Sequence, residues 1–109
     1  MLLKTLLLFC SLILLAGSAL AAEIYGQLWD TAKRAPRGAI ISTDCGAEAA
    51  VDHYGRYRLT DLPLRKTCTL SINYKQRTSN PVNIYTGSNR NSANFMLKIS
   101  GDRLLLIRR

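Results

Sequence analysis

Residues 51–74, with the sequence VDHYGRYRLTDLPLRKTCTLSINY, decide the fold class of this chain. In the second half of this stretch, apolar and polar side chains alternate with a period of two. One face of the alternating segment carries the side chains of Cys68, Leu70, Ile72 and Tyr74. Such a pattern is typical of a β-strand with one buried face and one face in water. We therefore predict a strand over Thr67–Tyr74.

A turn and a shorter strand precede it. Asp52 is expected to shape the turn through its side-chain oxygen, and Gly55 is expected to adopt a positive φ. His53 is the only histidine, and a solvated position in this turn is expected for it rather than a catalytic one. The shorter strand is predicted over Arg56–Leu59. It should end before Leu62–Leu64, because Pro63 cannot donate a hydrogen bond to a sheet.

Five more strands are predicted, which gives an all-β fold. No window shows convincing helical periodicity, and the polar segment Thr86–Ser92 is expected to be a loop. Short strands at regular spacing, separated by turn residues, indicate a single small antiparallel β-sandwich of about seven strands. The five further strands are Glu23–Asp30, Ala39–Asp44, Glu48–Val51, Val82–Tyr85 and Asn94–Ile99.

The first 21 residues are predicted to be a signal peptide that is removed on export. Lys4 provides a positive start, an apolar segment follows, and Ala19-Leu20-Ala21 supplies the small residues of a cleavage site. The apolar segment is short for a membrane span, which needs roughly 20 residues. The mature domain would then be residues 22–109, in the periplasm or outside the cell.

Export to an oxidising compartment would change how the cysteines are interpreted. Cys10 leaves with the signal peptide, so that the mature chain retains Cys45 and Cys68. An even number in an oxidising compartment favours a disulfide, and both residues fall on the apolar phase of their segments. A zinc site would need about four ligands, and a redox pair usually has C-x-x-C spacing. We expect a structural disulfide.

Four pieces of this sequence resemble the carboxypeptidase regulatory-like domain, a transthyretin-type β-sandwich. They are IYGQLWD, APRGAIIS, VDHYGRYRLTDLP and TCTLSINY. The family pattern has I-x-G-x-V-x-D, G-A-x-V and T-D-x-x-G-x-Y-x-L motifs, an L-P-x-G linker and a strand of alternating apolar residues. The matching positions are Ile24, Gly26, Asp30, Gly38, Ala39, Ile41, Asp52, Gly55, Tyr57 and Leu59.

Two residues depart from that family pattern. Arg65 stands where the linker usually has Gly, so that turn is expected to differ. Cys68 stands where an aromatic residue usually fills the core, and we infer that the disulfide replaces it. The resemblance implies a non-catalytic domain that serves as a folding aid, spacer or binding module.

Positive charge is the second informative feature. Without Lys4 the chain has fourteen cationic residues against seven acidic ones, a formal net charge of +7. Such a field attracts polyanions, although it also serves solubility alone. Arg56 and Arg58 share the outward face of a strand and, with Arg65 and Lys66, are the candidate anion-binding residues. Tyr25 and Trp29 also lie opposite an apolar face, which makes a sugar-stacking platform conceivable.

The segment Leu104–Ile107 has no alternation, because Leu104, Leu105, Leu106 and Ile107 are all apolar. We expect a turn at Ser100–Asp102 and a final strand that packs one face on the core. Its other face or its open edge is a candidate surface for a partner or for self-association. Cover by a loop of the same chain is the alternative.

No motif for nucleophilic, metal-dependent or phosphate-binding catalysis occurs in the sequence. We therefore expect no enzyme, no cofactor and no metal. The function expected first is that of an accessory or binding module of the cell envelope, with an envelope protein as partner. The alternative is a secreted module that binds anionic glycans or other polyanions through its basic surface. Neither nucleic acid as a physiological partner nor a membrane span after cleavage is expected.

Overall fold

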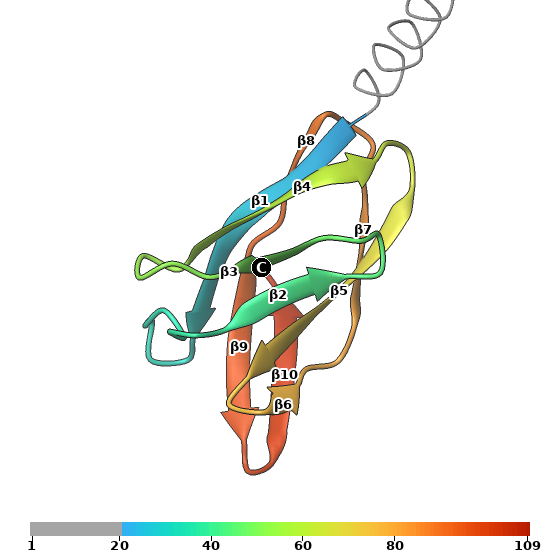
Figure 1. Ribbon diagram of the computed structural model, residues 1–109. Coiled ribbons are helices and arrows are strands. Elements are labelled where there is room, and N and C mark those ends of the chain that lie inside the picture. Colours follow the sequence, from blue (N-terminus) through green and yellow to red (C-terminus); the bar gives the residue numbers. More distant parts are fainter. Residues whose placement is uncertain (1–20) are drawn as a thin grey trace, which may run out of the picture.

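The structure is a computed structural model that describes residues 21–109 (Figure 1). The predicted signal peptide lies outside the described residues except for Ala21, the first residue of the first strand. Between residues 21 and 109, no helix is long and apolar enough to cross a membrane. The strands are β1 (Ala21–Asp30), β2 (Ile40–Thr43), β3 (Glu48–Ala50), β4 (Arg56–Pro63), β5 (Thr67–Tyr74), β6 (Arg77–Thr78), β7 (Val82–Tyr85), β8 (Arg90–Ser92), β9 (Phe95–Ser100) and β10 (Arg103–Arg108).

The all-β class is therefore confirmed, and the strands form two sheets. The first has the order β10-β9-β1-β4, with β8 also paired to β1. The second has the order β3-β2-β5-β6, with β7 also paired to β5. Most pairs are antiparallel, as expected, but β1 runs parallel to both β8 and β9. Figure 1 shows the segment from β7 to β8 passing from the second sheet to the first.

The strand prediction was wrong at three places, and residues 21–109 contain ten strands rather than about seven. The two-residue strand β6 was not predicted. Arg90–Ser92 is not loop but strand β8, which alternation could not reveal because its residues are polar and it pairs with β1 through the backbone. The strand that begins at Arg56 extends to Pro63 rather than ending at Leu59. Because β4 is at the edge of its sheet, Pro63 at its end removes no essential hydrogen bond. The strand bulges near Asp61, which has a φ of +57°.

Side chains from both sheets meet in one apolar core. The alternation predicted over Thr67–Tyr74 is confirmed, because Cys68, Leu70 and Ile72 are all fully buried. They belong to the same buried cluster as Leu28 and Phe95 from the other sheet, which are buried equally well. The remaining large side chains with almost no exposed area are Ile24, Ile41, Leu59, Leu62, Ile84 and Leu97.

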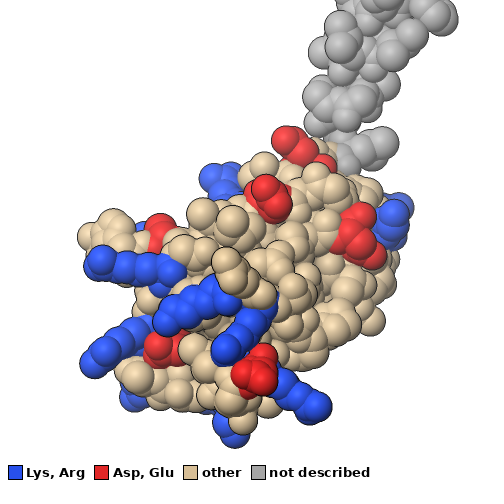
Figure 2. All heavy atoms as spheres, turned by 60° about the horizontal axis from the view of Figure 1, so that its bottom comes forward, with Lys and Arg blue, Asp and Glu red and all other residues tan. Residues whose placement is uncertain are grey.

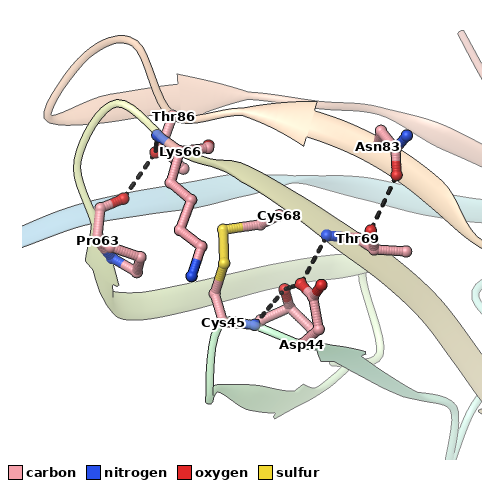
Figure 3. Close-up of a disulfide and its surroundings, with 9 residues drawn as sticks. Asp44, Cys45, Pro63, Lys66, Cys68, Thr69, Asn83 and Thr86 are labelled. Atoms are coloured by element: carbon pink, nitrogen blue, oxygen red, sulfur yellow. Dashed lines mark hydrogen bonds between the residues drawn. A yellow bond between two sulfur atoms is a disulfide. The ribbon is translucent and has the colours of Figure 1, made fainter.

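The predicted disulfide between Cys45 and Cys68 is confirmed, with a Cα–Cα distance of 5.6 Å (Figure 3). It joins the β2–β3 turn to β5, and hydrogen bonds continue the same connection. The Thr69 backbone N–H donates to Asp44 Oδ1 at 2.8 Å, and the Asp44 N–H donates to the Thr69 carbonyl at 3.2 Å. By closing a loop with a sequence separation of 23, the disulfide should stabilise the fold by about 3 kcal/mol.

The turn before β4 has the predicted conformation. Gly55 has a φ of +81°, and Asp52 Oδ1 accepts hydrogen bonds from the N–H groups of Tyr54 and Arg56 at 2.9 and 2.8 Å. Both bonds lower the pKa of the Asp52 carboxyl, and the bond from Arg56 has the larger effect. His53 is exposed, as expected. Arg65, which stands where the family linker usually has Gly, has a φ of +57°.

The final strand packs one face on the core, as predicted. Leu104 and Leu106 are buried, whereas Leu105 and Ile107 point outward and are each 37% exposed. The edge of β10 is not fully open, because Asn80 bonds to it through both ends of its side-chain amide. Its Nδ2 donates to the Leu106 carbonyl at 3.1 Å, and its Oδ1 accepts from the Leu106 N–H at 2.7 Å. Only Leu105 and Ile107 therefore remain as candidates for a partner surface.

Gly26 marks the closest approach of two backbone segments. A Cβ at this position would lie 1.9 Å from the Ala93 carbonyl oxygen. That carbonyl also accepts a hydrogen bond from the hydroxyl of buried Tyr57. The Ala93 N–H donates a hydrogen bond to the Tyr25 carbonyl at 2.9 Å. Only glycine allows β1 to meet the β8–β9 connection at this distance.

Gly26→Ala should lower the free energy of unfolding by at least about 2 kcal/mol, because neither backbone segment can yield without breaking these bonds. Gly87→Ala is the matched control. A Cβ there would meet only the side chain of Tyr85, at 3.1 Å, and Tyr85 is 59% exposed and free to move. Chemical denaturation measures both. Equal effects of the two substitutions would contradict the proposed role of Gly26.

Candidate anion-binding site

Arg56 and Arg58 lie on the outer face of the first sheet, as their alternation predicted. In the antiparallel register of β1 and β4, Arg56 is opposite Gln27 and Arg58 is opposite Tyr25. Both arginines are exposed. Arg65 and Lys66, the other two candidate residues, are also exposed but follow the opposite end of β4. The structure therefore does not bring the four cations into one site.

A third arginine joins this face from a distant part of the sequence. Strand β8 pairs with β1 so that Arg90 is beside Glu23 and Ser92 is beside Tyr25. The guanidinium carbon of Arg90 is 4.7 Å from the centre of the Tyr25 ring, within the range of a cation–π interaction. Tyr25 is thus flanked by Arg58 on one side and covered by Arg90 from the other.

Glu23 holds two of the arginines in place. Its Oε2 accepts a hydrogen bond from Nε of Arg58 at 2.7 Å and forms an ion pair with Nη2 of the same side chain, also at 2.7 Å. Its Oε1 accepts a hydrogen bond from Nε of Arg90 at 2.7 Å. The Glu23 side chain is only 12% exposed, whereas those of Arg58 and Arg90 are 66% and 68% exposed. The hydrogen bond from Arg58, and after it the hydrogen bond from Arg90, lowers the pKa of the Glu23 carboxyl.

This arrangement leaves donors directed to solvent. The remaining N–H groups of Arg58 and Arg90 have no hydrogen-bond partner among residues 21–109. One carboxylate is shared by two guanidinium groups, so the cluster keeps a net positive charge. Planar guanidinium groups match the oxygens of carboxylate, sulfate and phosphate, and a shared carboxylate reduces the conformational freedom they would lose on binding.

The arginines line a hollow of about 730 Å³ on the outer face. We call this surface the arginine face and define it by Tyr25, Gln27, Arg56, Arg58, Arg90 and Asn94. Gln27 and Asn94 add amide groups that can bond to hydroxyl or acidic oxygens. Ala49, Ala50 and Asp52 form another part of its wall. No group of three or more potential metal-ligating side chains occurs in the described part of the chain.

Sequence reasoning found Tyr25, Arg56 and Arg58 but missed Glu23 and Arg90. Alternation along a single strand identifies the outward residues, but it does not say which strands are neighbours. Arg90 was assigned to a loop because β8 carries no apolar periodicity. The register between β1 and β8 was the missing information, and no motif in the sequence encodes it.

Comparison with known proteins gives no relative for this chain. No protein-family model matches it, and neither a curated protein nor a solved structure is similar enough to count as a match.

Glu23→Gln should remove a pH-dependent contribution to stability. Because the folded-state pKa lies below the ordinary value of 4.5, the ionised carboxylate stabilises the fold above that pH. This contribution is lost as the pH falls through the lowered pKa. Denaturation at pH 7 should therefore separate wild type from the variant more widely than denaturation at pH 3.

Glu48→Gln serves as the control, because Glu48 is exposed and forms no ion pair among residues 21–109. A Glu23→Gln effect of the same size at both pH values would show that the ion pairs with Arg58 and Arg90 contribute nothing to folding.

Proposed function

We propose that this protein is a non-enzymatic exported module that binds acidic polysaccharide through the arginine face. The observation that carries the proposal is the Arg58–Glu23–Arg90 cluster, in which a shielded carboxylate orients two exposed guanidinium groups. A surface charged only for solubility needs no such organisation. Tyr25 lies beneath the Arg90 guanidinium and orients that cation further. The amide groups of Gln27 and Asn94 beside the cations can bond to sugar hydroxyl groups.

The size and shape of the site support a polymer rather than a small, enclosed ligand. Binding pockets for small molecules are usually concave and mainly apolar, and they bury most of the ligand. The arginine face instead lies along the outside of a sheet, and its cations are exposed. The formal net charge of the predicted mature chain adds long-range attraction for any polyanion.

We further infer that the two sheets form a sandwich of the transthyretin type, as in carboxypeptidase regulatory-like domains. Two positions of the resemblance support this inference. Gly26 lies where a side chain would collide with backbone, and Gly55 has a positive φ. A binding role without catalysis agrees with what the resemblance implies.

The binding proposal predicts that Arg58→Gln/Arg90→Gln lowers the affinity for heparin by at least about tenfold, since charge-assisted hydrogen bonds are lost. Arg65→Gln/Lys66→Gln removes the same formal charge at the far end of β4 and should change affinity by no more than about threefold. Calorimetric titration measures both, and thermal melting checks that the variants fold.

A charge-preserving variant separates a specific site from general attraction. Arg58→Lys/Arg90→Lys should also weaken binding, because lysine lacks the planar fork of the guanidinium group. Wild-type binding should decrease as salt rises, since screening shortens to about 3 Å at 1 M. Equal losses in the Arg58/Arg90 and Arg65/Lys66 variants would show that only the overall charge matters.

A second candidate function is docking to an envelope protein, and an exposed apolar row favours it. Trp29 on β1 is beside Met96 on β9, which is opposite Ile107 on β10. Trp29 is 40% exposed, and Leu105 on the same face adds to the row. Aromatic residues and methionine are enriched in protein interfaces.

Leu105→Ser/Ile107→Ser tests this candidate, because both side chains point outward while Leu104 and Leu106 hold the strand to the core. The folded variant should lose a partner that copurifies with the wild type from envelope extracts after chemical crosslinking. Recovery of the same partner in the same amount by both proteins would exclude this surface.

A further inference from the structure

A second hollow, of about 660 Å³, lies where β1 ends. Three cations of the β1–β2 loop, Lys33, Arg34 and Arg37, line it together with aromatic rings. We call it the loop hollow. Figure 2 looks toward this end of the molecule and shows Lys and Arg side chains projecting over much of the visible face, with fewer acidic ones. The rings and the imidazole in the lining are those of Trp29, Tyr54, Tyr74 and His53.

The backbone of the β1–β2 loop is ordered by Asp30, the acidic residue in the lining. Asp30 Oδ1 accepts hydrogen bonds from the N–H groups of Ala32 and Arg34, both at 2.9 Å. The Asp30 N–H also donates to the Arg34 carbonyl at 2.9 Å. Because this carboxylate bonds to its own loop, the side chains of Lys33, Arg34 and Arg37 remain exposed around the hollow.

Two connections join the loop hollow to the arginine face. The guanidinium carbon of Arg56, in the arginine face, is 5.3 Å from the centre of the Tyr54 ring, in the loop hollow. Tyr25 and Trp29 point to the same side of β1 and are four residues apart, which corresponds to about 13 Å along a strand. Cations and aromatic rings therefore continue from one hollow to the other.

We infer that the arginine face and the loop hollow are two subsites for one extended chain of acidic polysaccharide. This inference rests on the proposed function and adds the mode of binding. A single acidic sugar can contact one subsite only, whereas a polymer with a charge on successive residues can occupy both. When two subsites bind the same chain, the second contact is intramolecular, and the affinity exceeds that of either subsite alone.

The test is calorimetric titration with size-defined heparin oligosaccharides, a disaccharide and a dodecasaccharide. Wild type should bind the longer chain at least about tenfold more tightly per protein site. Arg34→Gln/Arg37→Gln should lose most of this gain while it retains binding of the disaccharide at the arginine face. Arg65→Gln/Lys66→Gln removes the same charge elsewhere and should keep the full gain in affinity for the longer chain. It is the control for the statistical advantage that a longer chain has because it offers more binding positions.

The possible outcomes distinguish a failure of the two-subsite inference from a failure of the proposed function. If wild type binds neither oligosaccharide, both the proposed function and the two-subsite inference fail. If it binds both and the Arg34/Arg37 variant keeps the same gain as the Arg65/Lys66 control, the proposed function stands and the two-subsite inference is wrong. Tyr54→Ala, at an exposed ring, provides a second variant that should also reduce the gain.

Discussion

At Gly26 the backbone of β1 lies directly against the Ala93 carbonyl, and the rest of the first sheet depends on this contact. It fixes how the β8–β9 segment runs beside β1, with β8 along Glu23–Tyr25 and β9 along Leu28–Asp30. The same carbonyl accepts the Tyr57 hydroxyl from β4, and burial raises the pKa of that hydroxyl. The close approach between β1 and the β8–β9 connection therefore also involves β4, and it leaves no room for any side chain at position 26.

The register set in this way also builds the charged surface. The register of β8 with β1 places Arg90 beside Glu23, and Arg58 on β4, which is opposite Tyr25, reaches the same carboxylate from the other side. A carboxylate that is mostly removed from water would be unfavourable without partners, and two guanidinium groups supply them. The arginines remain largely exposed, so that the ion pairs orient them without using all of their donors. In this account, the structural constraint at Gly26 and the proposed binding site belong to the same arrangement of strands.

The sequence predicted the features that depend on local chemistry. Alternation located β5 and the outward position of Arg58. The expectation of export, together with the alternation of both cysteines with polar residues, predicted the disulfide, and the Asp52–Gly55 turn has the expected geometry. What it could not predict depends on pairing between distant segments. Strand β8 has no apolar pattern, so Arg90 was placed in a loop and its ion pair with Glu23, 67 residues away in the sequence, was missed. The contact of Asn80 with β10 was missed for the same reason, since a side-chain amide that bonds to a strand edge leaves no periodic signal.

The claim at the centre of this account is that Arg58 and Arg90, held by Glu23, form a specific site for acidic sugars. NMR titration of the arginine Nε–Hε and backbone amide signals with an acidic oligosaccharide tests it most directly. We predict that the largest shifts occur at the Nε–Hε groups of Arg58 and Arg90 and at the amides of Tyr25 and Ser92. Shifts of similar size at every exposed arginine, including Arg65 and Arg103, would contradict it and would leave only a general attraction of the basic surface for polyanions.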